Sequence, residues 1–165
     1  MPQVRTLLAA ALLALAATAP AGCASENALE GSLGEVLDLG FEDVEVSITE
    51  TAVIVGYHKP HGEGRDIVFK LVSHTVPAEV VPKQVIDLSP AADGSSRAEC
   101  TRSAADDPIR TFAAIRTGTL TFDAPLVLDQ PVGGEFRVTL GEGGDAGKGR
   151  TAFGTFRVLR VVPGS

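Results

Sequence analysis

The side chains best suited to metal chemistry gather in one short segment, which contains His58, His61, Glu63 and Asp66. Imidazole nitrogens and carboxylate oxygens are ligands for zinc and copper, so these four residues are the candidate metal ligands. A zinc site needs three or four rigidly held ligands, whereas the prolines and glycines of residues 59–64 are typical of a polar turn. In a hairpin that turns there, His74 would lie far from His58. We therefore expect no bound metal and no cofactor.

A glycine-rich segment at residues 141–150 resembles a phosphate-binding loop in its spacing. Gly141, Gly143 and Ala146 satisfy the dinucleotide fingerprint, but that motif requires a following helix whose N-terminus holds the pyrophosphate. Residues 151–162 are instead rich in β-branched and aromatic residues. The segment is predicted to be a hairpin connection between two strands.

Neither a nucleophilic nor an acid–base catalytic set is recognisable in the sequence. There is no Gly-x-Ser-x-Gly elbow, and Glu99 beside Cys100 disfavours a reactive thiolate. We therefore expect no catalytic residues and predict that the protein is not an enzyme.

The composition argues against two classes of binding protein. The 165 residues include 21 acidic and 14 basic side chains, giving a formal net charge of −7, with no Trp and one Tyr. Nucleic-acid affinity depends mainly on Lys and Arg, and flat rings are needed to stack on bases. A nucleic-acid partner and a carbohydrate that binds by stacking are both disfavoured.

The N-terminal residues have the pattern of a secretory signal peptide. Arg5 is the only charged residue before Glu26, and an unbroken apolar run of 11 residues extends from Leu7 to Ala17. This run is too short to cross about 30 Å of hydrocarbon as a helix, which takes roughly 20 residues. A basic start, an apolar centre and then small residues indicate export, with residues 1–22 as the signal peptide.

Ala21-Gly22-Cys23 follows this region and resembles the end of a bacterial lipobox. The chain is similar in this respect to uncharacterised lipoproteins of high-GC Gram-negative bacteria. The resemblance implies a lipid on Cys23, which would anchor the protein to a membrane. Ala24 in the next position implies sorting to the outer membrane. Ala19-Pro20-Ala21 also fits ordinary signal peptidase, so a soluble periplasmic or secreted protein is the alternative.

The chemical state of Cys23 determines whether Cys100, the other cysteine of the chain, can form a disulfide. If Cys23 carries a lipid, Cys100 is a lone thiol, which is acceptable where it is buried. If Cys23 is free, the pair could close a disulfide loop worth roughly 4 kcal/mol on the chain-entropy estimate. The residues flanking Cys23 favour lipidation, and the Cys23–Cys100 disulfide is the alternative.

The remaining chain alternates apolar and polar residues with the period of two that is typical of half-buried strands. Residues 44–49 and 52–58 are predicted to form a hairpin. Further strands are expected over residues 36–39, 67–72 and 85–88. Residues 91–108 are predicted to be a loop with one helical turn near 103–106.

One pattern, Gly-polar-apolar-polar-apolar, occurs three times, at residues 118–122, 134–138 and 154–158. The spacings of 16 and 20 residues suit an antiparallel meander. The apolar members are predicted to form the core side of one sheet: Leu120, Phe122, Phe136, Val138, Phe156 and Val158. Together with the other strands, this pattern predicts an all-β fold, an antiparallel β-sandwich or small barrel of about 7–9 strands.

Acidic and basic residues are concentrated at opposite ends of the sequence. Eight acidic residues and no Lys or Arg lie between Cys23 and Tyr57, whereas residues 146–165 contain four basic residues and no acid. This distribution is typical of a solvated face, or of acidic N-terminal strands that lie beside the basic C-terminal strand.

The sequence thus predicts a signal peptide over residues 1–22, an acidic flexible tether over 23–34 and a single β-sandwich domain over 35–163. The expected function is that of a non-enzymatic lipoprotein of the cell envelope, a structural or binding module attached to the membrane through Cys23. The alternative is a secreted metal-binding protein or hydrolase that uses the loop from His58 to Asp66.

Overall fold

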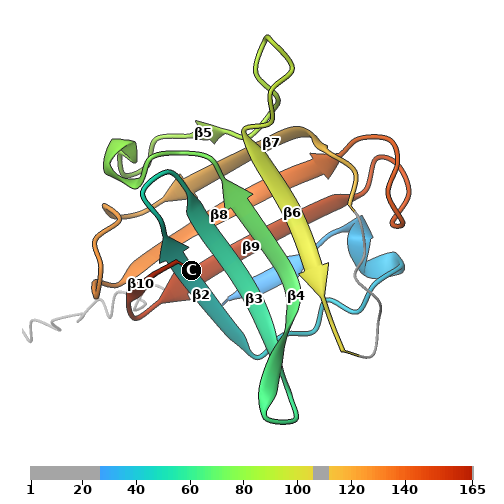
Figure 1. Ribbon diagram of the computed structural model, residues 1–165, viewed down its shortest axis with the longest axis horizontal. Coiled ribbons are helices and arrows are strands. Elements are labelled where there is room, and N and C mark those ends of the chain that lie inside the picture. The colour runs from blue at the N-terminus through green and yellow to red at the C-terminus, as the bar shows by residue number, and fades with distance from the viewer. Residues whose placement is uncertain (1–26, 106–111, 165) are drawn as a thin grey trace, which may run out of the picture.

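The computed structural model describes residues 27–105 and 112–164, which form two packed five-stranded sheets (Figure 1). The all-β prediction is confirmed, and the two sheets make an open sandwich and not a closed barrel. Within the described ranges there are ten strands and two short 3-10 helices, and no helix is long and apolar enough to cross a membrane. The predicted signal peptide and Cys23 lie outside these ranges.

The first sheet has the strand order β1-β9-β8-β7-β5, and all of its neighbouring strands are antiparallel. Its strands are β1 (Ala28–Glu30), β5 (Ile86–Asp87), β7 (Ile115–Phe122), β8 (Val132–Leu140) and β9 (Thr151–Val158). The three repeated segments lie in the adjacent strands β7, β8 and β9, so the predicted meander is confirmed. The glycine-rich residues 141–150 connect β8 to β9, as expected.

The second sheet has the strand order β10-β2-β3-β4-β6. Its strands are β2 (Asp43–Ile48), β3 (Val53–His61), β4 (Gly64–Ser73), β6 (Ala98–Ser103) and β10 (Val161–Pro163). β10 runs parallel to β2, whereas the other neighbours are antiparallel. The antiparallel pairing of β2 with β3 confirms the predicted hairpin.

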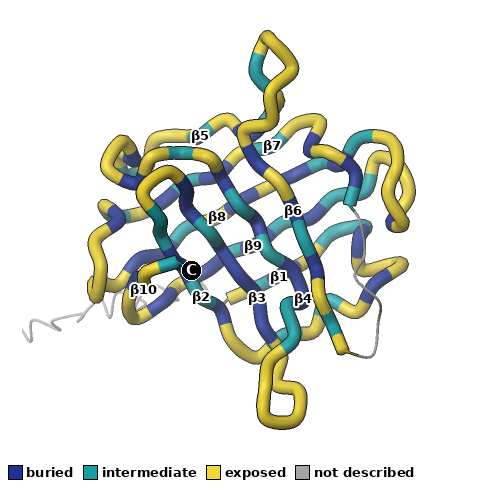
Figure 2. Tube along the Cα trace, in the orientation of Figure 1, coloured by how far each residue is buried: buried dark blue, intermediate teal, exposed yellow. Residues whose placement is uncertain are grey.

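A single apolar core fills the space between the sheets, and Figure 2 shows the buried stretches that face it. All six apolar residues predicted from the repeats are buried. Phe136 of the first sheet stacks on Phe69 of the second with ring centroids 5.5 Å apart, and Tyr57 packs edge-on against Phe136 at 6.1 Å. These rings bind the two sheets together at their centre.

Gly154 allows β9 to approach this aromatic cluster closely. A Cβ atom at Gly154 would overlap the Phe136 ring and lie 2.5 Å from Tyr57 Oη. The Tyr57 hydroxyl in turn donates a hydrogen bond of 3.0 Å to the Thr155 carbonyl. The glycine that opens the third repeat is therefore required by packing.

The strand prediction is wrong in two segments. β6 lies within residues 91–108, which were expected to be a loop, and Ser103 ends a strand where a helical turn was expected. Residues 36–39 form no strand but follow the 3-10 helix η1 (Ser32–Glu35). The inward residues of β6 are small or charged and so lack the apolar alternation on which the prediction depends, whereas the mostly apolar residues 36–39 continue from η1 as a turn.

The sandwich also begins earlier than the sequence predicts. Leu29 in β1 and Leu33 in η1 are buried, although both lie in the expected tether over residues 23–34. β1 pairs with β9, and β10 pairs with β2, so the C-terminal strands do lie beside the acidic N-terminal ones. Arg150 pairs with Glu35 and donates a 3.1 Å hydrogen bond to the Ser32 carbonyl. These contacts hold the N-terminal segment on the domain.

Candidate functional site

The four candidate metal ligands are divided between two parts of the surface. β3 extends to His61 and β4 begins at Gly64, so the turn between them is shorter than predicted. His58 lines a cavity of about 170 Å³ on the outer face of the second sheet. His61 and Asp66 line a different one of about 320 Å³, with Nδ1 and Oδ2 separated by 3.7 Å. Glu63 lies in the turn itself.

In residues 27–105 and 112–164, no three His, Cys, Asp or Glu side chains are close enough to share a metal ion. The strand alternation explains why the segment is divided. Neighbouring residues of a strand point to opposite faces, so His58 and His61, three positions apart in β3, line different cavities although they are close in sequence.

His58 is a packed residue, only 6% exposed, whose ring lies across Gly56. A Cβ atom on Gly56 would stand 2.6 Å from His58 Nε2. His58 Nδ1 has no hydrogen-bond partner of normal geometry among the described residues. Burial lowers the pKa of His58, and the Arg65 charge lowers it further, against the opposing effects of Glu45 and Asp43. Burial therefore favours the neutral form of the ring.

Cys100 lies on the core side of β6 as a free, buried thiol. Burial raises the pKa of this thiol, and the neighbouring Glu99 raises it further. The thiol therefore stays protonated and shielded, as expected of a structural cysteine. Cys23, the predicted lipidation site and the partner in the alternative disulfide, lies outside the described residues.

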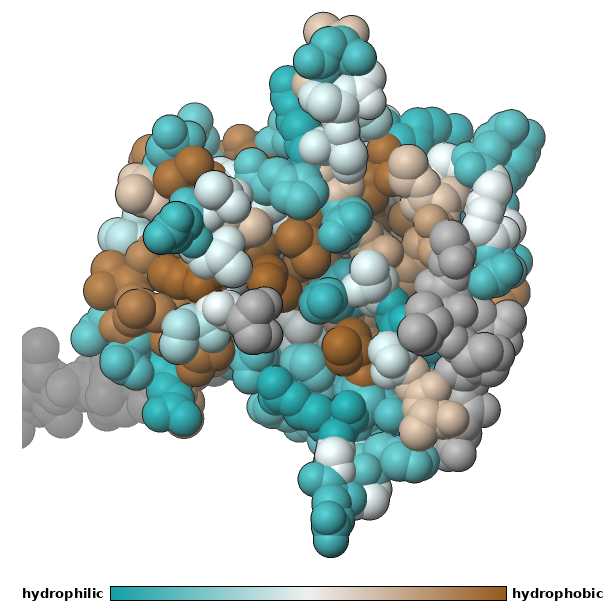
Figure 3. Space-filling model, in the orientation of Figure 1, coloured by the Kyte–Doolittle hydropathy of each residue, from teal (hydrophilic) through white to brown (hydrophobic). Residues whose placement is uncertain are grey.

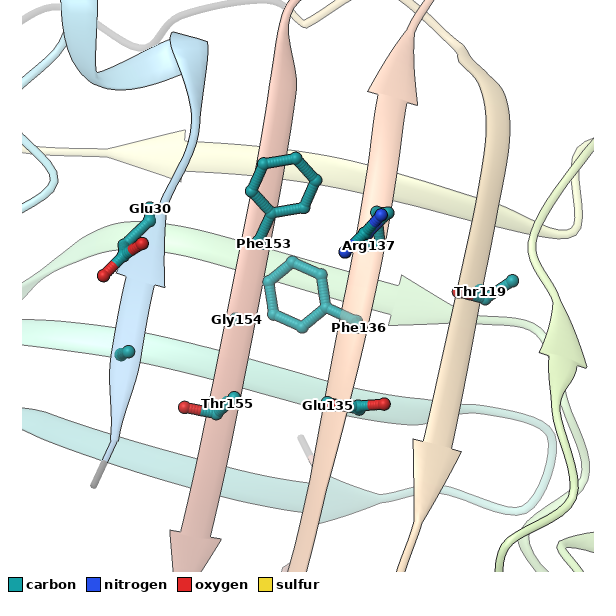
Figure 4. Close-up of a pocket in the computed structure, with 9 residues that line it drawn as sticks. Glu30, Thr119, Glu135, Phe136, Arg137, Phe153, Gly154 and Thr155 are labelled. Atoms are coloured by element: carbon teal, nitrogen blue, oxygen red, sulfur yellow. The ribbon is translucent and has the colours of Figure 1, made fainter. Parts of the chain in front are cut away.

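A groove of about 490 Å³ lies on the outer face of the first sheet (Figure 4). We call it the outer groove. It is lined by residues of β1, β9, β8 and β7: Ala28, Glu30, Thr119, Glu135, Phe136, Arg137, Phe153, Gly154 and Thr155. Strand register places its side chains in rows, and one row runs from Glu30 through Phe153 and Arg137 to Thr119.

Charged groups of both signs face the solvent in the outer groove. The Arg137 guanidinium lies 4.7 Å from the centroid of the Phe153 ring, a cation–π contact that fixes both side chains. Among the described residues, Glu30, Glu135 and Arg137 make no ion pair. Their charges are thus not neutralised by ion-pair partners among the described residues.

A smaller cavity of about 260 Å³ adjoins the outer groove, and Glu135 and Thr155 line both. It leads toward Arg157 and Asp123, whose side chains form an ion pair of 3.0 Å. The two cavities make a polar strip across the sheet that offers hydroxyl, carboxylate and guanidinium groups to a ligand. Such a surface can orient a polar molecule through hydrogen bonds.

The sequence interpretation did not identify the outer groove. It assigned the apolar residues of the repeats to the core, correctly, but gave no role to the residues between them. One signal was present: Phe153 is an aromatic residue out of phase with the inward-facing Ala152, Gly154 and Phe156 of β9. An aromatic ring on the solvent side of a strand is a signal of a candidate interaction surface.

The fold and the groove together define a mainly antiparallel β-sandwich with a polar groove on the outer face of one sheet. The sequence matches no protein family, and no curated protein or solved structure shows significant similarity to it. The candidate site is accordingly assigned from the geometry of this chain.

Proposed function

We propose that the protein is an exported, lipid-anchored protein of the bacterial outer membrane whose β-sandwich binds a polar ligand without catalysing a reaction. The observation that carries the binding role is the set of charged residues in the outer groove that have no ion-pair partner in the described part of the chain, Glu30, Glu135 and Arg137. The anchoring role rests on the signal-like N-terminus and on Gly22-Cys23.

The lining of the outer groove indicates the chemistry of the ligand. Two carboxylates accept hydrogen bonds, the guanidinium donates them, and the Thr119 hydroxyl can do either. Because the cation is already stacked on Phe153, its donors point to a limited set of directions. A small polar molecule with both donors and acceptors fits this arrangement better than an apolar one.

The anchoring part is tested by intact mass spectrometry of the full chain recovered from the membrane fraction of a Gram-negative host. We expect a diacylglyceryl or triacyl addition on Cys23 and its loss in Cys23→Ser. A protein that starts at Gly22 and contains a Cys23–Cys100 disulfide would overturn the lipoprotein assignment.

The binding part is tested by nuclear magnetic resonance with a panel of free amino acids, dipeptides and disaccharides. We expect binding members to shift the amide signals of Thr119, Glu135 and Phe153, and Arg137→Gln to abolish those shifts. Arg65→Gln, which removes an arginine from the opposite sheet, is the matched control and should leave them unchanged. Shifts confined to other surfaces, or none with any member, would refute the outer groove as the binding site.

The alternative of a metal-binding protein or hydrolase uses the segment from His58 to Asp66. It gains no support from the positions of His58 and His61, which line different cavities. A zinc, copper or calcium titration followed by thermal shift tests it directly. A rise in Tm that is lost in His61→Ala would favour this alternative over the proposed one.

A further inference from the structure

Exposed aliphatic side chains are concentrated at one end of the sandwich. The described residues include seven large apolar side chains that are exposed, and six of them lie in the connections at this end: Val76, Val81, Val85, Val127, Leu128 and Leu159. We call these six residues the apolar end. Leu159, on the two-residue turn between β9 and β10, is 91% exposed. The seventh, Val36, follows η1 at the opposite end.

Strand directions place these connections together. β7 ends at Phe122, β8 begins at Val132 and β9 ends at Val158, so the connections after β7 and β9 leave the same end of the sheet (Figure 1). The Lys83 amide donates a 2.7 Å hydrogen bond to the Phe122 carbonyl, which ties the connection before β5 to this end. The Asp129 amide likewise donates to the Val161 carbonyl at 2.9 Å.

The described chain also begins at the apolar end. β1 is antiparallel to β9, with Ala28 opposite Thr155, and the Arg157 amide donates a 2.6 Å hydrogen bond to Asn27 Oδ1. Cys23 precedes Asn27 by four residues. At about 3.5 Å per extended residue, Cys23 can lie no more than roughly 14 Å from Asn27. A lipid on Cys23 would therefore hold this end, and not the end of η1, close to the bilayer.

We propose that the apolar end docks onto the surface of the membrane that holds the lipid anchor, with Leu159 inserted among the acyl chains. This inference rests on the proposed lipidation of Cys23. Figure 3 shows hydrophobic surface gathered at the left of the view, beside β10, where these connections lie. An exposed apolar patch of this kind marks an interaction surface, and the short reach to Cys23 identifies the bilayer as its occupant.

The charged residues around the apolar end indicate whether docking requires anionic lipid headgroups. Lys83 and Arg160 are exposed in these connections and so are Glu79 and Asp129, while Arg157 is paired with Asp123. With both signs present, docking depends on apolar insertion and not on anionic headgroups, so phosphatidylcholine vesicles are sufficient. In this orientation the strands of the first sheet stand away from the membrane, and the outer groove opens to the side.

The absence of tryptophan from the chain permits a direct test. Leu159→Trp places a single fluorophore at the apolar end, and Val36→Trp places the matched control at the opposite end. Each full-length protein is produced in a Gram-negative host, checked by mass for the lipid, and reconstituted in phosphatidylcholine vesicles with or without brominated acyl chains. We expect brominated lipid to remove about half of the emission of Leu159→Trp, since insertion reaches the acyl boundary, and to leave Val36→Trp unchanged.

The outcomes separate this inference from the proposed function. If the lipid is present and Leu159→Trp is quenched no more than Val36→Trp, docking is wrong while the anchor stands. If the mass shows no lipid on Cys23, the proposed anchoring is wrong, and the inference fails with it. Leu128→Trp provides a second fluorophore at the apolar end and should be quenched as well. Equal quenching of Val36→Trp and Leu159→Trp would also contradict a defined orientation.

Discussion

The two outer faces of the sandwich use their charged residues in different ways. On the second sheet, Arg65 reaches across to Glu45 at 2.9 Å and to Asp43 at 3.9 Å, and these residues surround the buried His58 ring. On the first sheet, Arg137 lies on the Phe153 ring, and the carboxylates near it have no cationic partner within the described chain.

Around His58 the charges of the second sheet pair with one another, whereas the charged residues of the outer groove have no ion-pair partner among the described residues. Both faces arise from the same alternation of apolar and polar residues, which determines only that polar groups point outward. Cross-strand partners then decide whether those groups bind one another or remain available. These unpaired groups are the physical basis for our proposal that a ligand binds on the first sheet.

The largest expected effect concerns two glycines that each make room for a ring. Gly154→Ala would force a Cβ into Phe136 and Tyr57 inside the core, and we expect it to lower the free energy of unfolding by about 1–3 kcal/mol. Gly56→Ala meets only the His58 imidazole on the outer face, which can swing outward, so its cost should be smaller. Urea unfolding measures both changes.

Gly64→Ala serves as the control for these glycine variants, because the nearest atom to its new Cβ would be 3.7 Å away. Its effect should be near zero. A loss for Gly56→Ala that equals the loss for Gly154→Ala would mean that the outer face of the second sheet is as rigid as the core.

The second prediction concerns the pH dependence contributed by His58. Because its pKa is lowered from 6.5 in the folded state, the unfolded chain takes up a proton first as the pH falls below about 6.5. Stability from this group is complete above pH 6.5 and is lost between that value and the lower folded pKa. The Tm of His58→Gln, measured by thermal unfolding, should therefore fall less steeply with decreasing pH over this interval than the Tm of the unmodified protein. Identical slopes would show that His58 is protonated alike in both states.

The smallest expected changes in the free energy of unfolding come from replacing one arginine on each outer face, Arg65 on the second sheet and Arg137 on the first. Arg65→Gln removes a partly exposed ion pair and should cost about 0.2–1 kcal/mol at low salt, with less cost at high salt because exposed charges are screened. Arg137→Gln breaks a ring contact and no ion pair, so its cost should change little with salt. Urea unfolding at two ionic strengths compares them. Equal salt dependence would remove the distinction between the faces.

The sequence predicts much of the fold because alternation is strong wherever large apolar residues mark the inward side. β2, β3, β4 and the three repeat strands are recognised in this way. β6 is not predicted as a strand because its inward residues are Ala98, Cys100 and Arg102, of which none is a large apolar residue. Arg102 is buried only because its Nη1 donates to the carbonyls of Asp38 and Val68, at 2.9 and 3.0 Å. Such partners lie far along the chain and leave no local pattern.

The candidate site is harder to predict for a related reason. The outer groove is assembled by strand register from four strands, so Glu30 and Thr119 share a row without sharing a motif. The His58–Asp66 segment has the opposite property, since its residues are contiguous in sequence and divided in space. Register between strands depends on the whole sheet, and a single sequence does not specify it locally.

The pairing of the terminal strands has a consequence for the timing of folding. β1 pairs with β9 and β2 with β10, so the earliest strands find these neighbours only when the last ones have been synthesised. Contacts between residues so distant in sequence slow folding, because a long loop must close before they form. A nascent chain of this topology stays incomplete until its final residues emerge. For a protein exported as we propose, that delay would keep the chain unfolded while it passes through a translocation channel.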